Sequence, residues 1–78
     1  MKLAYDSRYN IAYIYLEERT AEVETVRVSD ELNVDLTPDG KIYGIELLNA
    51  NVQLRGLAEG KVVFENEATG KTIEVSLP

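Results

Sequence analysis

The run from Ile11 to Leu16 is six apolar or aromatic residues long, and it stands in a chain of 78 residues. Its residue types fit a pleated strand, and it is too short to form a helix of its own. Because no polar residue alternates along it, we expect a strand that is covered on both faces. A chain of this length buries only about 60% of its unfolded surface. A chain of this size therefore has few side chains with which to cover both faces of such a strand.

Two residue types that support small folds are missing. The sequence contains no Cys and no His, which excludes disulfides and the usual ligand sets for zinc, copper and iron. All-oxygen sites for calcium or magnesium remain, but the spacing of Asp30, Asn33, Asp35, Asp39 and Gly40 does not fit a calcium loop. We therefore expect no metal and no cofactor, and association with another chain remains as the expected support. Catalysis by a Cys nucleophile or by a Ser–His pair is excluded as well.

The first half of the chain has the pattern of two hairpins. Residues 2–16 are predicted to form the first, because Asp6, Ser7 and Asn10 are typical turn residues. Residues 22–28 predict a strand with a bulge or a bent edge between Val23 and Val26. Residues 32–36 alternate cleanly between apolar and polar types, and residues 37–41 read Thr-Pro-Asp-Gly-Lys. That segment predicts a tight turn with a positive φ at its glycine.

The strand after this turn, residues 42–48, is expected to place Tyr43, Ile45 and Leu47 on one face. Gly44 and Glu46 fall on the other face, and a glycine inside a strand marks a bulge or a close approach by another group. Residues 49–57 begin with Asn49, which is able to cap a helix of at most two turns. Residues 61–66 and 72–77 then predict a third hairpin. The fold class expected is mostly β (α+β): an antiparallel sheet or small open barrel of three hairpins, with one short helix near residues 50–57, in a single domain of residues 1–78.

Several of these segments together are similar to a known family signature. They are Tyr5-Asp6, the run 12–16 (Ala-Tyr-Ile-Tyr-Leu), Val34-Asp35 and the stretch 39–50 with its Gly-Ile-Glu core. They resemble a family of small bacterial and archaeal proteins that is catalogued as a domain of unknown function. The resemblance covers about residues 1–50 and implies a short antiparallel sheet followed by a helix, and it assigns no activity, cofactor or catalytic residue. Residues 7–9 (Ser-Arg-Tyr) depart from the family's pattern, and the hairpin of residues 61–78 lies outside it.

The net charge of the chain limits the classes of molecule that it is expected to bind. The formal net charge is −6, from 14 acidic and 8 basic residues. Such a chain repels phosphate backbones and anionic lipids, so we expect no nucleic acid and no membrane, and a basic protein is the favoured partner. No apolar stretch approaches the roughly 20 residues needed to cross a bilayer, and the first residues lack the apolar core of a signal peptide. A cytoplasmic location is expected.

Three carboxylates and three other residues are the candidates for a site. Two carboxylates held close together can act as acid and base, which allows a small hydrolase or isomerase that uses Asp6, Asp35 or Glu46. The structural interpretation is stronger: Asp6 forms a turn, Asp35 lies on a solvent-facing strand surface, and Glu46 pairs with a lysine or arginine. Gly44 leaves room for a ligand or a backbone beside Glu46.

Tyrosines are numerous for this length, with five in the chain. Tyr13 and Tyr15 lie on the strand with two apolar faces, so they face either the chain's own helix and third hairpin or another subunit, and core packing is as well supported as an interface. We therefore expect a non-enzymatic, homo-oligomeric interaction module, most simply a homodimer, that joins sheets or edge strands through residues 11–16. The alternative is the carboxylate-dependent hydrolase or isomerase.

Overall fold

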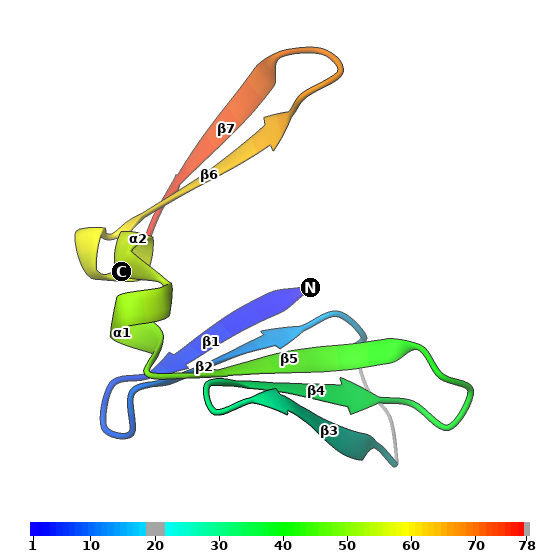
Figure 1. Ribbon diagram of the computed structural model, residues 1–78. Coiled ribbons are helices and arrows are strands. Elements are labelled where there is room, and N and C mark those ends of the chain that lie inside the picture. Colours follow the sequence, from blue (N-terminus) through cyan, green and yellow to red (C-terminus); the bar gives the residue numbers. More distant parts are fainter. Residues whose placement is uncertain (19–21, 78) are drawn as a thin grey trace.

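The computed structural model describes residues 1–18 and 22–77. It consists of a five-stranded antiparallel sheet, two short helices and a separate two-stranded hairpin (Figure 1). The strands are β1 (Lys2–Asp6), β2 (Ile11–Tyr15), β3 (Glu24–Ser29), β4 (Leu32–Leu36), β5 (Ile42–Leu48), β6 (Lys61–Asn66) and β7 (Lys71–Ser76), and the helices are α1 (Ala50–Gln53) and α2 (Arg55–Glu59). The order in the sheet is β1-β2-β5-β4-β3, and β6 pairs with β7 alone. The sheet is not closed into a barrel, so of the two predicted forms the structure has the antiparallel sheet.

The predicted hairpins are present. β1 pairs with β2, β4 with β5, and β6 with β7, all antiparallel. The turn between β4 and β5 closes as its sequence predicts: the Gly40 N–H donates to the Thr37 carbonyl at 2.9 Å, the Thr37 N–H donates to the Lys41 carbonyl at 2.8 Å, and Gly40 has φ 88°. Because the sheet order places β2 between β1 and β5, β2 is an internal strand. A second chain can therefore meet β2 only at its faces and not at an edge.

The bulge predicted in β3 exists at a different place. The register with β4 shifts between Arg27 and Ser29, rather than between Val23 and Val26. Val28 is the extra residue there, at the end of the strand where the chain turns toward Asp30. The Arg27 side chain bonds to Asp30 across this turn, Nη2 to Oδ1 at 2.7 Å. A bulge next to a turn increases the local twist of an edge strand.

A second bulge lies in β5, where the glycine predicts one. Asp35 pairs with Gly44 and Leu36 pairs with Ile42, which leaves Tyr43 as the extra residue. A bulge turns the side chain of its extra residue out of strict alternation. The Tyr43 ring accordingly lies beside Tyr15, with ring centroids 6.2 Å apart. The prediction that Tyr43 shares a face with Ile45 and Leu47 is therefore wrong.

The two faces of the sheet differ in character. Residues paired across antiparallel strands share a face, and one row across all five strands is wholly apolar: Leu3, Ile14, Ile45, Val34 and Val26. We call this side the apolar face. The opposite side carries tyrosines, carboxylates and amides, and we call it the tyrosine face. Among the described residues, the buried hydrophobic ones are Ala12 and Ala50, and no large side chain is fully buried.

The short helical segment predicted near residues 50–57 is present as α1 and α2. Asn49 occupies the N-cap position, but its φ of 53° is left-handed and its side chain does not cap the helix. Asn10, in the turn between β1 and β2, attaches α1 to the sheet instead. Its carbonyl accepts from the Ala50 N–H at 3.0 Å, its Oδ1 accepts from the Asn51 N–H at 2.9 Å, and its Nδ2 donates to Asn51 Oδ1 at 2.7 Å. These contacts set where the helices, and the hairpin after them, leave the sheet.

Candidate functional site

The tyrosine face is organised by the pairing of β2, β5, β4 and β3. In one row Tyr15 pairs with Gly44, Gly44 with Asp35 and Asp35 with Thr25. In the next row Tyr13 pairs with Glu46, which pairs with Asn33. Because a strand turns every second side chain to the same side, both rows face the same solvent.

A hydrogen-bonded bridge crosses this face. The Tyr13 ring leans diagonally over Gly44, and its hydroxyl donates to Asp35 Oδ2 at 2.5 Å. The Thr25 hydroxyl donates to the other carboxylate oxygen, Oδ1, also at 2.5 Å. A Cβ at Gly44 would overlap the Tyr13 ring, with Cζ 2.6 Å away. The prediction of a close approach at Gly44 is therefore confirmed, and the approaching group is a side chain of the same chain.

The environment of Tyr13 keeps its proton in place. Burial raises the pKa of the Tyr13 phenol above its ordinary value, and the hydrogen bond to Asp35 and the charge of that carboxylate raise it further. The phenol is therefore neutral near pH 7 and acts as a hydrogen-bond donor. With both oxygens of Asp35 holding hydroxyl donors, this carboxylate connects strands rather than offering a free base.

The other two carboxylates have separate partners. Glu46 is half-buried, and its Oε1 accepts from Asn33 Nδ2 at 3.0 Å, so its partner is an amide and not the lysine or arginine expected. Asp6 lies at the end of β1, where Arg8 Nη2 reaches Oδ2 at 2.9 Å and the Arg8 N–H donates to Oδ1 at 2.9 Å. The hydrogen bond from the Arg8 guanidinium holds the pKa of Asp6 below its usual value. Asp6 is thus the turn residue of the structural interpretation.

The hollow beside Asp6 does not bring the three carboxylates together. A hollow of about 500 Å³ at the β1–β2 turn is lined by both Asp6 and Tyr13, but by neither Asp35 nor Glu46. Asp35 and Glu46 are diagonal neighbours on β4 and β5, and each is bonded to a different partner. Within the described part of the chain, no three acidic side chains are grouped as a metal site requires.

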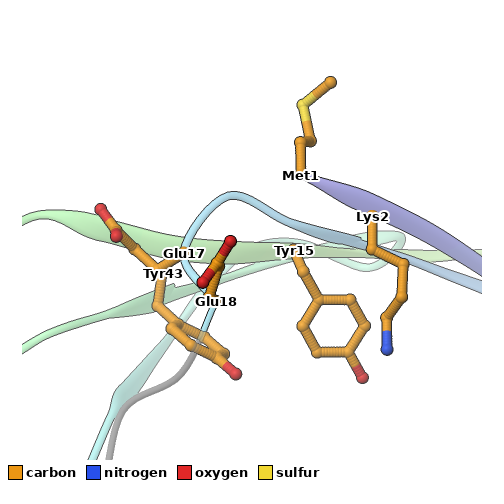
Figure 2. Close-up of a pocket in the computed structure, with 6 residues that line it drawn as sticks. All are labelled: Met1, Lys2, Tyr15, Glu17, Glu18 and Tyr43. Carbon is orange, nitrogen blue, oxygen red and sulfur yellow. The ribbon is translucent and has the colours of Figure 1, made fainter.

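An aromatic hollow lies at the other end of the tyrosine face (Figure 2). It has a volume of about 300 Å³ and is lined by Met1, Lys2, Tyr15, Glu17, Glu18 and Tyr43. Lys2 Nζ lies 4.3 Å from the centroid of the Tyr15 ring, which is within the range of a cation–π contact. Figure 2 shows the rings of Tyr15 and Tyr43 and the Lys2 side chain directed to the same side of the sheet. This hollow already holds an ammonium group against an aromatic ring, with two glutamates at its margin.

Comparison with known proteins identifies the family of this chain. Residues 2–51 match the family model described as "Protein of unknown function (DUF2283)". The chain belongs to the DUF2283 family. The resemblance noted in the sequence to a family of unknown function is thereby confirmed, over nearly the same residues. No curated protein and no solved structure matches this chain.

The DUF2283 match ends just after the start of α1. It contains the whole five-stranded sheet, whereas α2 and the β6–β7 hairpin follow it. No helix within residues 1–18 and 22–77 has the length and apolar character to cross a bilayer. Every residue singled out from the sequence as a candidate for the site lies in the part that matches DUF2283.

Five of the six candidate residues of this DUF2283 chain share the tyrosine face near its centre: Tyr13, Tyr15, Asp35, Gly44 and Glu46. Asp6 lies apart, at the β1–β2 turn. Sequence reasoning missed Lys2, Glu17, Glu18 and Tyr43 as neighbours of Tyr15. Strict alternation assigns Tyr43 to the wrong face, and only the bulge at Gly44, which the sequence does mark, was a signal for its true position.

Proposed function

We propose that this DUF2283 chain is a non-enzymatic protein-interaction module that works as a homodimer. The observation that carries the proposal is the surface that a single chain leaves exposed. The accessible surface is 6167 Å², whereas a compact monomer of 8.7 kDa exposes about 4,700 Å². The excess, about 1,400 Å² per chain, exceeds the ~800 Å² that each partner buries in a standard interface.

The dimensions of the chain agree with this excess. The radius of gyration is 14.0 Å, and a compact chain of the same length has a value of about 11.5 Å. Large apolar side chains remain exposed on several elements, among them Phe64 at 64%, Ile73 at 63% and Val28 at 58%. Exposed apolar area of this extent is typical of surfaces that bind another protein.

The tyrosine face supports a second part of the proposal, a basic partner protein. The net charge of −6 attracts cationic segments. The aromatic hollow has the chemistry to hold a lysine or arginine side chain of such a segment, since Tyr15 already contacts the ammonium of Lys2 and Glu17 and Glu18 line the same hollow. The cytoplasmic location expected from the sequence remains a prediction, and cell fractionation tests it.

The homodimer is tested by sedimentation equilibrium across a range of micromolar concentrations. We expect a mass of twice 8.7 kDa, with dissociation only on strong dilution. A folded species that remains at the mass of one chain throughout this range, with a β-sheet circular dichroism spectrum, overturns the proposal.

The basic partner is tested separately with a short lysine-rich peptide, followed by NMR shifts of the Tyr15 and Tyr43 rings. We expect shifts confined to the hollow, with binding that weakens as salt is added. A Glu17→Gln/Glu18→Gln variant is expected to bind more weakly, and a Glu65→Gln/Glu67→Gln variant, which changes the same charge on the hairpin, serves as the matched control. Equal loss of binding in the two variants contradicts a specific site.

A further inference from the structure

The hairpin of β6 and β7 has one apolar and one polar face. Cross-strand pairs show the division: Val62 pairs with Val75 and Phe64 with Ile73, and these four side chains share one face. The exposed fractions on that face are 37% for Val62, 47% for Val75, 64% for Phe64 and 63% for Ile73. An isolated two-stranded hairpin is at best marginally stable in water. This apolar face therefore needs a cover.

The polar face of the hairpin is suited to remain in water. Lys61 Nζ and Glu74 Oε2 form an ion pair there at 3.2 Å, and both side chains are more than half exposed. Glu65 and Thr72 are paired on the same side. Val63, paired with Glu74, is the apolar exception on this side and is 52% exposed. The side with Phe64 and Ile73 carries four apolar residues and is the one with the greater need of a partner.

The apolar face of the sheet has the same requirement. Its outer residues, Leu3 on β1 and Val26 on β3, are 40% and 41% exposed, and the residues between them are half-buried. Figure 1 shows that the hairpin rises away from the sheet instead of lying on it. Much of the apolar face is consequently left open to solvent.

A hollow joins the two apolar surfaces. It has a volume of about 220 Å³ and is lined by Leu3, Ile14, Leu54, Gly56, Lys61 and Val62. Leu3 and Ile14 belong to the apolar face of the sheet, while Val62 belongs to the apolar face of the hairpin. Lys61, from the polar face of the hairpin, lines the hollow as well, so the hollow marks the base of the hairpin, where it leaves the sheet. Beyond this base, the apolar surfaces of the sheet and of the hairpin are both uncovered at an open angle (Figure 1).

Resting on the homodimer proposed above, we propose that the occupant of this angle is the hairpin of a second copy. Each hairpin lays its apolar face, built from Val62, Phe64, Ile73 and Val75, on the apolar face of the other chain's sheet. The exchange is reciprocal about a two-fold axis, so the same pair of surfaces is used twice. Both surfaces are supplied by one chain, which is the requirement for a self-complementary interface.

The sizes of the two surfaces match. A strand of six residues is about 20 Å long, and five strands side by side span about 19 Å between the axes of the outer strands. The hairpin of one chain is thus long enough to cross the whole sheet of the other. An interface that buried the whole excess of about 1,400 Å² on each chain would total about 2,800 Å², within the 2,000–5,000 Å² range of obligate dimers.

The absence of Cys from the chain allows a direct test by disulfide cross-linking. An Ile73→Cys variant and a tagged Ile45→Cys variant, of different mass, are mixed, allowed to exchange subunits and oxidised. Matched controls move each thiol to the neighbouring residue on the opposite face: Thr72→Cys on the hairpin and Glu46→Cys on the sheet. Sedimentation of each variant before oxidation establishes that it still dimerises.

We expect the disulfide between Ile73→Cys and Ile45→Cys to form at least tenfold faster than a disulfide in either control mixture. Equal rates in all mixtures, or a dominant Ile73→Cys homodimer, overturn the exchange of hairpins while the homodimer itself stands. A wild-type chain that sediments as a folded monomer overturns the proposed function first, and the exchange with it.

A charge substitution gives a second measurement. Ile73→Asp is expected to raise the dimer dissociation constant at least tenfold, whereas Thr72→Asp leaves it within about twofold. Since Ile73 is 63% exposed within its own chain, the sheet is expected to keep its circular dichroism spectrum in the variant. An Ile73→Asp variant that dimerises as tightly as the Thr72→Asp variant removes the hairpin from the interface.

Discussion

Tyr13 and Asp35 are 22 positions apart in the chain, and the hydroxyl of the first donates to the carboxylate of the second at 2.5 Å. The bond passes over β5, where Gly44 provides the space for the tyrosine ring. Since Thr25 holds the other oxygen of Asp35, one chain of contacts joins β2, β5, β4 and β3. It fixes the register of four strands on the side of the sheet that faces away from the apolar surface.

Removing the phenol oxygen of Tyr13 is expected to weaken the sheet. Tyr13→Phe keeps the ring and leaves one oxygen of Asp35 without its donor, and losing a hydrogen bond to a charged, half-buried group costs about 1–2 kcal/mol. Urea unfolding followed by circular dichroism measures the change in unfolding free energy. Tyr9→Phe is the control, because Tyr9 is 71% exposed; equal effects of the two substitutions would contradict the bridge.

The same pair predicts a dependence on alkaline pH. Burial, and then the bond to Asp35, raise the folded-state pKa of Tyr13 above the ordinary value of 10.0. The stabilisation that this gives is fully present below pH 10.0 and is lost as the pH rises through the folded-state pKa. The unfolding free energy of the wild type is therefore expected to fall more steeply above pH 10.0 than that of Tyr13→Phe. Parallel curves for the two proteins would show that Tyr13 titrates as an exposed phenol.

Gly44→Ala tests the close approach of the ring. The new methyl group overlaps the Tyr13 side chain, so the ring must move and its bond to Asp35 is broken, with a cost of about 1–3 kcal/mol. In a Tyr13→Ala background the same substitution is expected to stabilise by about 0.5 kcal/mol, because alanine loses less backbone entropy than glycine in a strand. A double-mutant cycle from urea unfolding measures this change of sign. An equal effect in both backgrounds would refute the contact.

Substitutions at Asn10 test how strongly its hydrogen bonds hold α1 to the sheet. Asn10→Gly removes the two side-chain bonds to Asn51, at about 1 kcal/mol each. Asn10→Ala removes the same bonds and also forces alanine to adopt a φ of 56°, which adds about 1 kcal/mol. We expect stability in the order wild type, Asn10→Gly, Asn10→Ala, together with faster amide exchange at Ala50 and Asn51. Unchanged exchange at those amides would show that the helix is held by other contacts.

Much of the fold follows from local sequence signals. The Pro38-Asp39-Gly40 turn and the alternation of residues 32–36 determine the hairpin of β4 and β5, and the turn residues 6–10 determine the first hairpin, because such signals act over a few residues. The bulge at Gly44 was predictable for the same reason. The effect of this bulge on Tyr43 was not predictable, because the direction of a bulged side chain depends on the strand opposite.

Local sequence patterns do not predict the contacts between segments that are far apart in the chain. Nothing local indicates that β2 pairs with β5, so the approach of Tyr13 to Asp35 and of Lys2 to Tyr15 needs the assembled sheet. Asn49 illustrates the same limit: its position at the helix start was predicted, but the left-handed backbone there turns its side chain toward Asn10, 3.4 Å from Nδ2 to Oδ1. The sequence therefore names candidate residues one at a time, whereas the contacts between them are seen only in the assembled sheet.

The hairpin that rises from the helices also bears on solubility. In the dimer proposed above Phe64 and Ile73 are covered, whereas a single chain exposes them to water, and repulsion among its surplus acidic groups then opposes aggregation. That repulsion disappears at the isoelectric point, near pH 4.5. The proposed exchange of hairpins therefore predicts that precipitation near this pH is suppressed to the extent that dimers cover Phe64 and Ile73.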